Sequence, residues 1–446
     1  MSAEETRAPG LSDGPDRKLG VLLATTLVAG NMIGSGIYLL PASTGQIGSA
    51  SILGWIIAIV GALILAGVFA RLTALWPRAG GMIGSIQAGL GRGAGFVGGF
   101  VYWVSCWIGN VAIALAATGY LAVFFPPLAR PAAATLSTIA ILWVLVAANI
   151  IGPRFVARFE GWTLAIGLLP VLSIALAGWF FFDPKVFAAS WNVSGKPLSI
   201  ALPQSVALVL WAFLGLESAS VVCGLVRDPV RVVPIATVGG VGIAAAVYLS
   251  ACGVVMGILP ASSLAHSNAP FADVVAATLG ASAAAFVAAC AALKACGTLG
   301  GWILVTAETA QSGATLGYFG RSSETGTGRS ASTANLLGTG LLMSLAVVAS
   351  SSPTLGQQFS LMISGAVVLS LFVYLLCALS LLKLSVALPP RSRVLNQVLA
   401  VGAGGFCLIL ILASDGHVLL MSLLTVGLGV LVHMLVNRGR SRGTMS

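Results

Sequence analysis

The chain has 446 residues, of which 58% are hydrophobic and 8% are charged, and its net charge is +10. Its mean hydropathy of +1.03 excludes an ordinary soluble domain and predicts a membrane protein with many spans. The positive charge does not indicate a nucleic-acid partner, because the basic residues fall in short loops between apolar runs, where they set the orientation in the bilayer.

About twelve apolar runs are long enough to cross the hydrocarbon of a bilayer as helices. In chain order they cover residues 20–46, 50–75, 94–125, 132–151, 160–182, 199–224, 232–259, 281–313, 333–352, 358–382, 394–413 and 416–436. The runs are continuously apolar and do not alternate with a period of two, which favours helices over a transmembrane barrel. The predicted fold class is therefore an all-α polytopic membrane protein.

The loop charges predict how the chain is oriented. With a cytoplasmic N-terminus, 18 lysines and arginines fall on the cytoplasmic side of the runs, 3 fall outside, and Lys294 lies within a span. This asymmetry predicts a multi-pass protein of the plasma (inner) membrane with both termini in the cytoplasm. The polar residues 1–18 and 437–446 are expected to be cytoplasmic tails, the first disordered and without the apolar core of a signal peptide.

The cysteines and histidines give no sign of a metal site. All seven cysteines lie inside predicted spans, and the three histidines have no acid or thiol neighbours at ligand spacing. No nucleophile and base are placed as a catalytic pair. We therefore expect no metal or other cofactor, and the pattern argues against an intramembrane enzyme.

The first run is interrupted by residues 30–36, Gly-Asn-Met-Ile-Gly-Ser-Gly. Three glycines in seven residues weaken the helix, and an unwound turn exposes backbone groups that hydrocarbon cannot satisfy. In transporters such a break binds a substrate carboxylate through freed N–H groups and an ammonium through freed carbonyls. The alternative is a glycine-lined contact between helices. The first interpretation predicts a carrier of a small zwitterion, embedded in the lipid bilayer.

The sixth run contains a second candidate break, residues 211–220, Trp-Ala-Phe-Leu-Gly-Leu-Glu-Ser-Ala-Ser. An odd number of crossings separates the two breaks, so they traverse the membrane in opposite directions, as two inverted five-helix repeats require. The predicted domains are residues 19–182 for the first repeat, 199–382 for the second, and 394–436 for two further helices. Helices one and six are expected to be discontinuous.

Two ionisable residues fall at membrane depth. Glu217 is expected to act in coupling, by taking up a proton or polarising the break, unless it is a hydrogen-bonded carboxyl that ties helix six to a neighbour. Lys294 is expected either to occupy a site where other carriers hold a sodium ion, or to exchange protons, or to extend toward the outer surface.

Helix three carries an aromatic face with one amide, because Tyr102, Cys106 and Asn110 recur every four residues. The amide of Asn110 must find a partner, either helix backbone or the polar end of a substrate. Trp211 and Trp302 are candidates for stacking on a planar cation, although membrane tryptophans often anchor at the interface.

Several motifs together resemble the amino acid–polyamine–organocation superfamily, and within it most closely the bacterial arginine/agmatine antiporters. The resemblance extends from Lys18 to about Asn437. The motifs that carry it are Gly-Asn-Met-Ile-Gly-Ser-Gly (30–36), Cys-Trp-Ile-Gly-Asn (106–110), Trp-Asn-Val-Ser-Gly (191–195), Gly-Leu-Glu-Ser-Ala-Ser-Val (215–221), Pro-Ile-Ala-Thr-Val-Gly-Gly-Val (234–241) and Gly-Gly-Trp (300–302).

The resemblance implies the sodium-transporter-like fold of two inverted repeats plus two helices, and the homodimer common among those antiporters. It also implies a role for each matching residue. Ser35 and the backbone of Gly36 would hold the substrate carboxylate, and the carbonyls of Met32, Trp211 and Leu214 would hold its α-ammonium. The guanidinium would stack on Trp302 and bond to Asn110 and to the backbone of Ser105 and Cys106. Gating and coupling would involve Tyr102 and Glu217.

The chain also departs from the antiporter pattern. Ala366 stands where the antiporters have a serine near the guanidinium, Lys294 replaces a small residue, and residues 80–85 lack the segment associated with acid activation. The predicted function is an antiporter that exchanges arginine, or another cationic amino acid, for agmatine or a related amine by alternating access. The alternatives are an exchanger or proton-coupled importer of neutral amino acids or polyamines, and a sensor that binds an amino acid without moving it.

Overall fold

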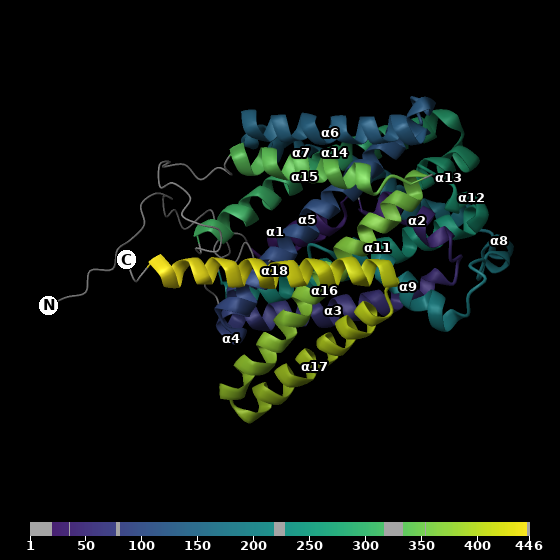
Figure 1. The fold of residues 1–446 in the computed structure, drawn as a ribbon. Helices are drawn as coiled ribbons and strands as arrows, with labels where there is room; N and C mark the ends of the chain where they lie inside the picture. Colours follow the sequence, from purple (N-terminus) through teal and green to yellow (C-terminus); the bar gives the residue numbers. More distant parts are fainter. Residues whose placement is uncertain are drawn as a thin grey trace.

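A computed structural model describes residues 20–34, 36–76, 81–217, 228–315, 333–352 and 354–443. Throughout these ranges the regular structure is helical, and the long helices run side by side as a bundle (Figure 1). The helices are α1 (Val21–Met32), α2 (Gly36–Gly45), α3 (Ser51–Leu75), α4 (Gly81–Leu90), α5 (Arg92–Leu121), α6 (Pro131–Ile151), α7 (Pro153–Ala177), α8 (Pro184–Ala189), α9 (Leu198–Leu210), α11 (Pro229–Ile258), α12 (Ala261–Ala265), α13 (Pro270–Leu279), α14 (Ala281–Thr315), α15 (Thr333–Ala349), α16 (Leu355–Leu384), α17 (Pro390–Leu412) and α18 (Gly416–Gly443), with short 3-10 turns η2 (Pro126–Ala129), η3 (Gly178–Phe181), η4 (Trp211–Phe213) and η6 (Ser385–Ala387).

Nine helices within the described ranges are long and apolar enough to cross a membrane. They coincide with nine of the apolar runs predicted from the sequence. The other three runs correspond to shorter helices: the first is divided between α1 and α2, the sixth is occupied by α9 and η4, and the ninth is α15, of 17 residues. The last helix, α18, continues to Gly443, so part of the predicted C-terminal tail is helical.

An α-helix ends at each of the two candidate breaks. The first helix ends at Met32, the backbone N–H of Gly34 turns back to the Met32 carbonyl at 2.6 Å, and α2 begins at Gly36. In the sixth run the α-helix ends at Leu210 and a 3-10 turn follows. Gly215 then adopts a φ of 100°, a conformation that strongly favours glycine. The rest of that run, residues 218–227, lies outside the described ranges, as do Ser35 and the predicted tail 1–18.

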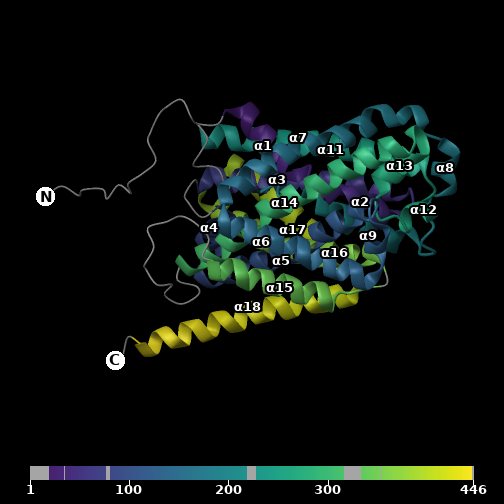
Figure 2. The ribbon, with the colours of Figure 1, turned by 90° about the horizontal axis from the view of Figure 1, so that it is seen from above.

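The ends of the bundle differ in structure. The first helix begins, and α18 ends, at one end, whereas the short helices α8, α12 and α13 gather at the opposite end (Figures 1 and 2). We call these the inner and the outer end, because the loop charges predict that the first faces the cytoplasm.

At the outer end α2 is fastened to its neighbours. The Tyr120 hydroxyl donates to the Tyr38 carbonyl at 2.9 Å, and the Tyr38 hydroxyl donates to the Gly167 carbonyl in α7 at 2.5 Å.

The core helices and the peripheral helices of the bundle differ in how much of their surface is buried. The central helix α5 packs against both α14 and α16, and it buries most of its faces. By contrast, α18 lies along the outside of the bundle (Figure 2) and exposes about half the surface of Leu420, Leu424 and Leu428. Apolar side chains displayed over a whole helix face indicate contact with lipid.

Candidate functional site

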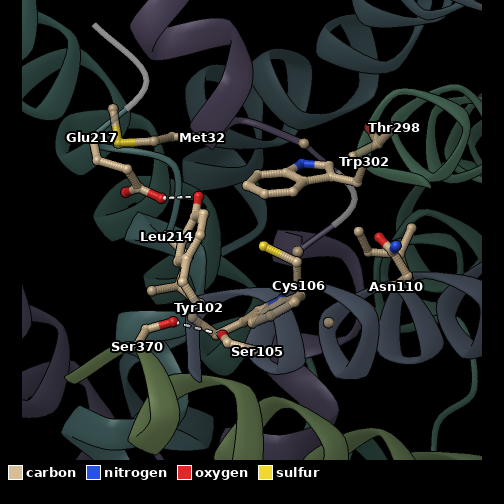
Figure 3. A pocket seen from close by; sticks show the side chains of 15 residues that line it. Met32, Tyr102, Ser105, Cys106, Asn110, Leu214, Glu217, Thr298, Trp302 and Ser370 are labelled. Atoms are coloured by element: carbon tan, nitrogen blue, oxygen red, sulfur yellow. Dashed lines mark hydrogen bonds between the residues drawn. The ribbon is translucent and has the colours of Figure 1, made fainter. Parts of the chain in front are cut away.

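A cavity lies where the first break and the turn η4 meet α5, α14 and α16. Its lining residues are Met32, Gly34, Gly36, Tyr102, Ser105, Cys106, Gly109, Asn110, Ile113, Trp211, Leu214, Glu217, Thr298, Trp302 and Ser370 (Figure 3). They come from segments separated by up to several hundred residues, so the cavity exists only in the folded bundle.

Glu217 is the acidic residue of the cavity, and it is 2% exposed. Its carboxylate accepts from the Tyr102 hydroxyl at 2.9 Å (Figure 3), from the Tyr374 hydroxyl at 2.8 Å, and from the backbone N–H of Gly215 at 3.1 Å. A buried carboxylate requires such donors, since it has lost its water. The bonds join the segment after η4 to α5 and α16, so a change at Glu217 is transmitted to three elements.

Trp211 is held between two glycines. A Cβ atom on Gly36 would lie 2.8 Å from the indole Nε1, and a Cβ on Gly109 would lie 3.0 Å from the indole Cη2. Both distances are shorter than a normal contact, so the ring fits only because neither position has a side chain. The indole N–H, which is buried, has no hydrogen-bond partner among the described residues.

The carbonyls freed by the two breaks are partly satisfied by Tyr248 of α11. Its hydroxyl lies within hydrogen-bond reach of the Met32 carbonyl and, at 3.1 Å, of the Ala212 carbonyl. A single O–H thus bridges the end of α1 and the turn η4. A carbonyl has two lone pairs, so the Ala212 carbonyl can still accept from a ligand, whereas the Met32 carbonyl already accepts from the Gly34 N–H as well. Tyr248 was not identified from the sequence.

The amide of Asn110 has a defined orientation. The Thr306 hydroxyl donates to the Trp302 carbonyl at 2.6 Å, and this uses its only proton. Thr306 can therefore only accept from Asn110, whose Nδ2 lies 3.1 Å from the hydroxyl oxygen. This arrangement directs the Asn110 Oδ1 elsewhere, and that buried oxygen has no partner among the described residues. The cavity wall thus contains an acceptor that a cationic ligand can satisfy.

Ser105 uses its hydroxyl within the protein. It donates to the Ala366 carbonyl at 2.9 Å and accepts from the Ser370 hydroxyl, 2.8 Å away (Figure 3). Another hydroxyl of the wall, that of Thr298, is buried without a partner among the described residues. The indole of Trp302 extends across the cavity toward Tyr102 (Figure 3).

Most of the residues singled out from the sequence line this cavity, with two exceptions. Ser35 falls outside the described residues. Lys294 does not line the cavity: it is 3% exposed, and its side chain packs over Gly167 of α7.

Thr298, Ser370 and Tyr374 were missed, although helical spacing contained a signal for each of them. Thr298 lies one turn before Trp302, and Ser370 and Tyr374 follow Ala366 at intervals of four residues. Within the described ranges, no three His, Cys, Asp or Glu side chains gather as metal ligands.

Comparison with known proteins places the chain in a family. The family model described as amino acid permease matches residues 19–429. The cadaverine/lysine antiporter of Escherichia coli (strain K12) is 42% identical over 303 residues, which are 68% of each chain. The putrescine transporter PotE of the same strain is 34% identical over 396 residues, 88% of this chain and 90% of that one. PotE of Haemophilus influenzae (strain ATCC 51907 / DSM 11121 / KW20 / Rd) is 34% identical over 359 residues.

These relatives are transporters and not enzymes. The chain is a member of the amino acid permease family, within the amino acid–polyamine–organocation superfamily.

Proposed function

We propose that the chain is a secondary active antiporter that exchanges a basic amino acid for a diamine by alternating access. The names of its relatives include lysine, cadaverine and putrescine, whereas the resemblance of the sequence motifs indicated arginine and agmatine. All of these substrates are cations with a terminal nitrogen. Lysine and cadaverine are the pair we favour, and arginine and agmatine are the second candidate.

The observation that carries the proposal is the charge and polarity of the cavity. Glu217 is its acidic residue, and no lysine or arginine is among its described lining residues. The two unpaired acceptors, Asn110 Oδ1 and Thr298 Oγ1, are also on its wall. A site with this balance stabilises cations, and it offers little to a neutral side chain.

The end of the cavity near Asn110 fits a substrate ammonium better than a guanidinium. An ammonium carries three N–H donors and a guanidinium five. Near Asn110 the supply of acceptors is small, since Ser105 already bonds to Ser370 and to a backbone carbonyl, and Ala366 has no hydroxyl. Each buried donor left without a partner costs about 1–3 kcal/mol, which favours lysine and cadaverine over arginine and agmatine.

The amino acid head group is assigned to the break between α1 and α2. The backbone N–H groups at the start of α2, at Gly36, lie at the positive end of that helix dipole, and this position suits a carboxylate. The carbonyl of Leu214 suits the α-ammonium, and the Met32 carbonyl keeps that assignment as a proposal from the sequence. Ser35 keeps its assignment to the carboxylate as a proposal from the sequence. A diamine has no carboxylate, so it depends more on the cavity acceptors.

Gating is assigned to Tyr102, Tyr374 and Glu217, whose hydrogen bonds tie three elements together on the cavity wall. Lys294 keeps its role in coupling as a proposal. We further propose that the protein lies in the plasma membrane with both termini in the cytoplasm, and that it forms the homodimer implied by the family resemblance.

The test is exchange in proteoliposomes loaded with cadaverine, with uptake of labelled lysine measured against a panel of unlabelled competitors. The panel includes putrescine, ornithine, arginine, agmatine and leucine, and liposomes without internal amine are the control. Lysine uptake that requires internal cadaverine supports the proposal. Stronger exchange of arginine for agmatine selects the second candidate. Binding without flux identifies a sensor, and preference for leucine overturns the cationic assignment.

A further inference from the structure

A second acidic side chain lies beside the cavity, in the contact between α7 and α14. The two helices approach so closely that glycines of α14 lie beneath side chains of α7. A Cβ atom on Gly297 would lie 1.8 Å from the Thr163 hydroxyl oxygen, and a Cβ on Gly301 would lie 2.1 Å from Glu160 Oε2. The Glu160 carboxylate thus rests on the backbone of α14 one residue before Trp302, which lines the cavity.

Glu160 makes no direct bond that explains its place. Its side chain is half-buried, and among the described residues its carboxylate makes neither a hydrogen bond nor an ion pair, while Lys294 interacts with it electrostatically. A carboxylate at this depth is costly unless it faces a water path or a cation, so it indicates a function. Cationic substrate is the counter-charge that the proposed function supplies.

The position of Glu160 connects it to the first break. Glu160 and Leu164 are one turn apart on the same face of α7. Leu164 packs on Gly30 of α1, where an added Cβ would lie 2.9 Å from its Cδ2, and α1 ends two residues later at Met32 on the cavity wall. Glu160 therefore lies toward the inner end of the junction between α1, α7 and α14.

This junction can open without disrupting the main contact of α1. That helix packs chiefly against α11, where an added Cβ on Gly240 would lie 2.6 Å from Val28. Its contact with α7 is much smaller. Separation of α1 from α7 would connect the cavity to the inner end past Glu160.

The two ends of the α7–α14 contact carry opposite charges. Lys294 packs over Gly167, which is seven residues, or about 10 Å, beyond Glu160 toward the outer end. Lys294 and Glu160 interact electrostatically. A cation that enters from the inner end meets the Glu160 carboxylate first, and the Lys294 ammonium repels it farther along. Along this contact, the charge pattern thus favours a cation at the inner end over one farther toward the outer end.

We propose that Glu160 is a positioning residue for the cationic substrate on the inner side of the cavity, and that it raises affinity there and not at the outer face. This inference rests on the proposed function, because it requires a cationic substrate. Local attraction by one carboxylate is expected to lower the inner-face KM for a diamine about tenfold. A dication responds more strongly than lysine, whose net charge is smaller.

The experiment compares full-length protein in inside-out and right-side-out vesicles, with KM measured for cadaverine and lysine at each face. For Glu160→Gln we expect about a tenfold rise in the inner-face KM for cadaverine, a smaller rise for lysine, and less than a twofold change at the outer face. Glu160→Asp keeps the charge and is expected to restore most of the inner-face affinity.

The matched control is Asp228→Asn, which removes one exposed acidic charge near the inner end of α11. An asparagine at that position can still cap the helix, as Asp228 does by accepting from the Arg231 N–H at 3.3 Å. We expect its KM values to stay within twofold of the unmodified protein. If Glu160→Gln does not insert into the membrane, the unmodified protein still tests the inference. Its inner-face KM for cadaverine must rise with salt concentration more steeply than its outer-face KM.

An unchanged inner-face KM in Glu160→Gln, an equal rise at both faces, or equal loss in Glu160→Asp would overturn the inference. Equal salt dependence at the two faces would also do so. Failure of the unmodified protein to exchange any basic amino acid or diamine would instead overturn the proposed function, so the two failures are distinguishable.

Discussion

The orientation of the Asn110 amide gives a sharp test of the cavity, through a residue behind the cavity wall. Thr306→Val removes the hydroxyl that accepts from Asn110 Nδ2 at 3.1 Å and keeps the shape of the side chain. The Trp302 carbonyl keeps its place in the helix, so the main loss is the partner of Asn110. The amide is then free to turn its Nδ2 toward the cavity, where it repels a substrate ammonium.

The magnitude follows from the cost of one buried donor without a partner, about 1–3 kcal/mol. If that cost appears in substrate affinity, the Kd for cadaverine rises about 5- to 150-fold. Equilibrium binding of labelled cadaverine to purified protein measures this directly. Because Thr306 acts through Asn110, the effect should largely disappear when Asn110→Ala is already present.

Thr309→Val is the matched control. Thr309 lies on the same helix and bonds to the carbonyl four residues earlier at 2.7 Å, as Thr306 does, but it is not a lining residue of the cavity. We expect its Kd to change less than twofold. The reasoning is refuted if Thr306→Val leaves Kd unchanged, if Thr309→Val matches it, or if the Thr306 and Asn110 effects are additive.

Three further changes test other parts of the site. Gly109→Ala places a Cβ 3.0 Å from Trp211, so exchange should slow several-fold without a fall in melting temperature. The control is Gly99→Ala, whose Cβ meets its nearest neighbour at 3.6 Å, and it should not differ from the unmodified protein. Tyr248→Phe removes the donor shared by two break carbonyls, of which Met32 keeps the Gly34 N–H and Ala212 is left unpaired. The variant should lower stability by about 1–3 kcal/mol; an unchanged melting curve would contradict this. Glu217→Gln replaces one of the two accepting oxygens by an NH2 group that cannot accept, so at least one of the three bonds is lost and the others fall to neutral strength. Exchange should fall more than tenfold; normal exchange would remove Glu217 from the gate.

Much of the fold was predictable because membrane spans are local features. A continuous apolar run of sufficient length must become a helix in hydrocarbon, whatever surrounds it. The nine long spans follow this rule. Residues 30–36 predicted an interruption for a similarly local reason, since glycine is the residue least bound to helical geometry, and α1 does end at Met32.

The site was only partly predictable. Trp302 stood out as an aromatic residue after two glycines, and Glu217 as an acid at membrane depth. Tyr374 and Thr298 did not, because a tyrosine or threonine in an apolar helix looks the same whether it faces lipid, core or cavity. Lys294 stood out for its charge, yet it packs against α7 and not on the cavity wall.

The sequence alone therefore determined the helical class, the positions of the nine long spans found in the described residues, and where the first helix is interrupted. These properties depend on the transfer of short segments into hydrocarbon, and each segment carries that information itself. Only the tertiary structure decided which polar atoms are already hydrogen-bonded within the protein and which remain free to bind a ligand. Tyr248 reaches a carbonyl 216 residues away, and Thr306 fixes an amide 196 residues away. A hydrogen bond requires its two groups within about 3 Å, and only packing of distant helices sets that distance.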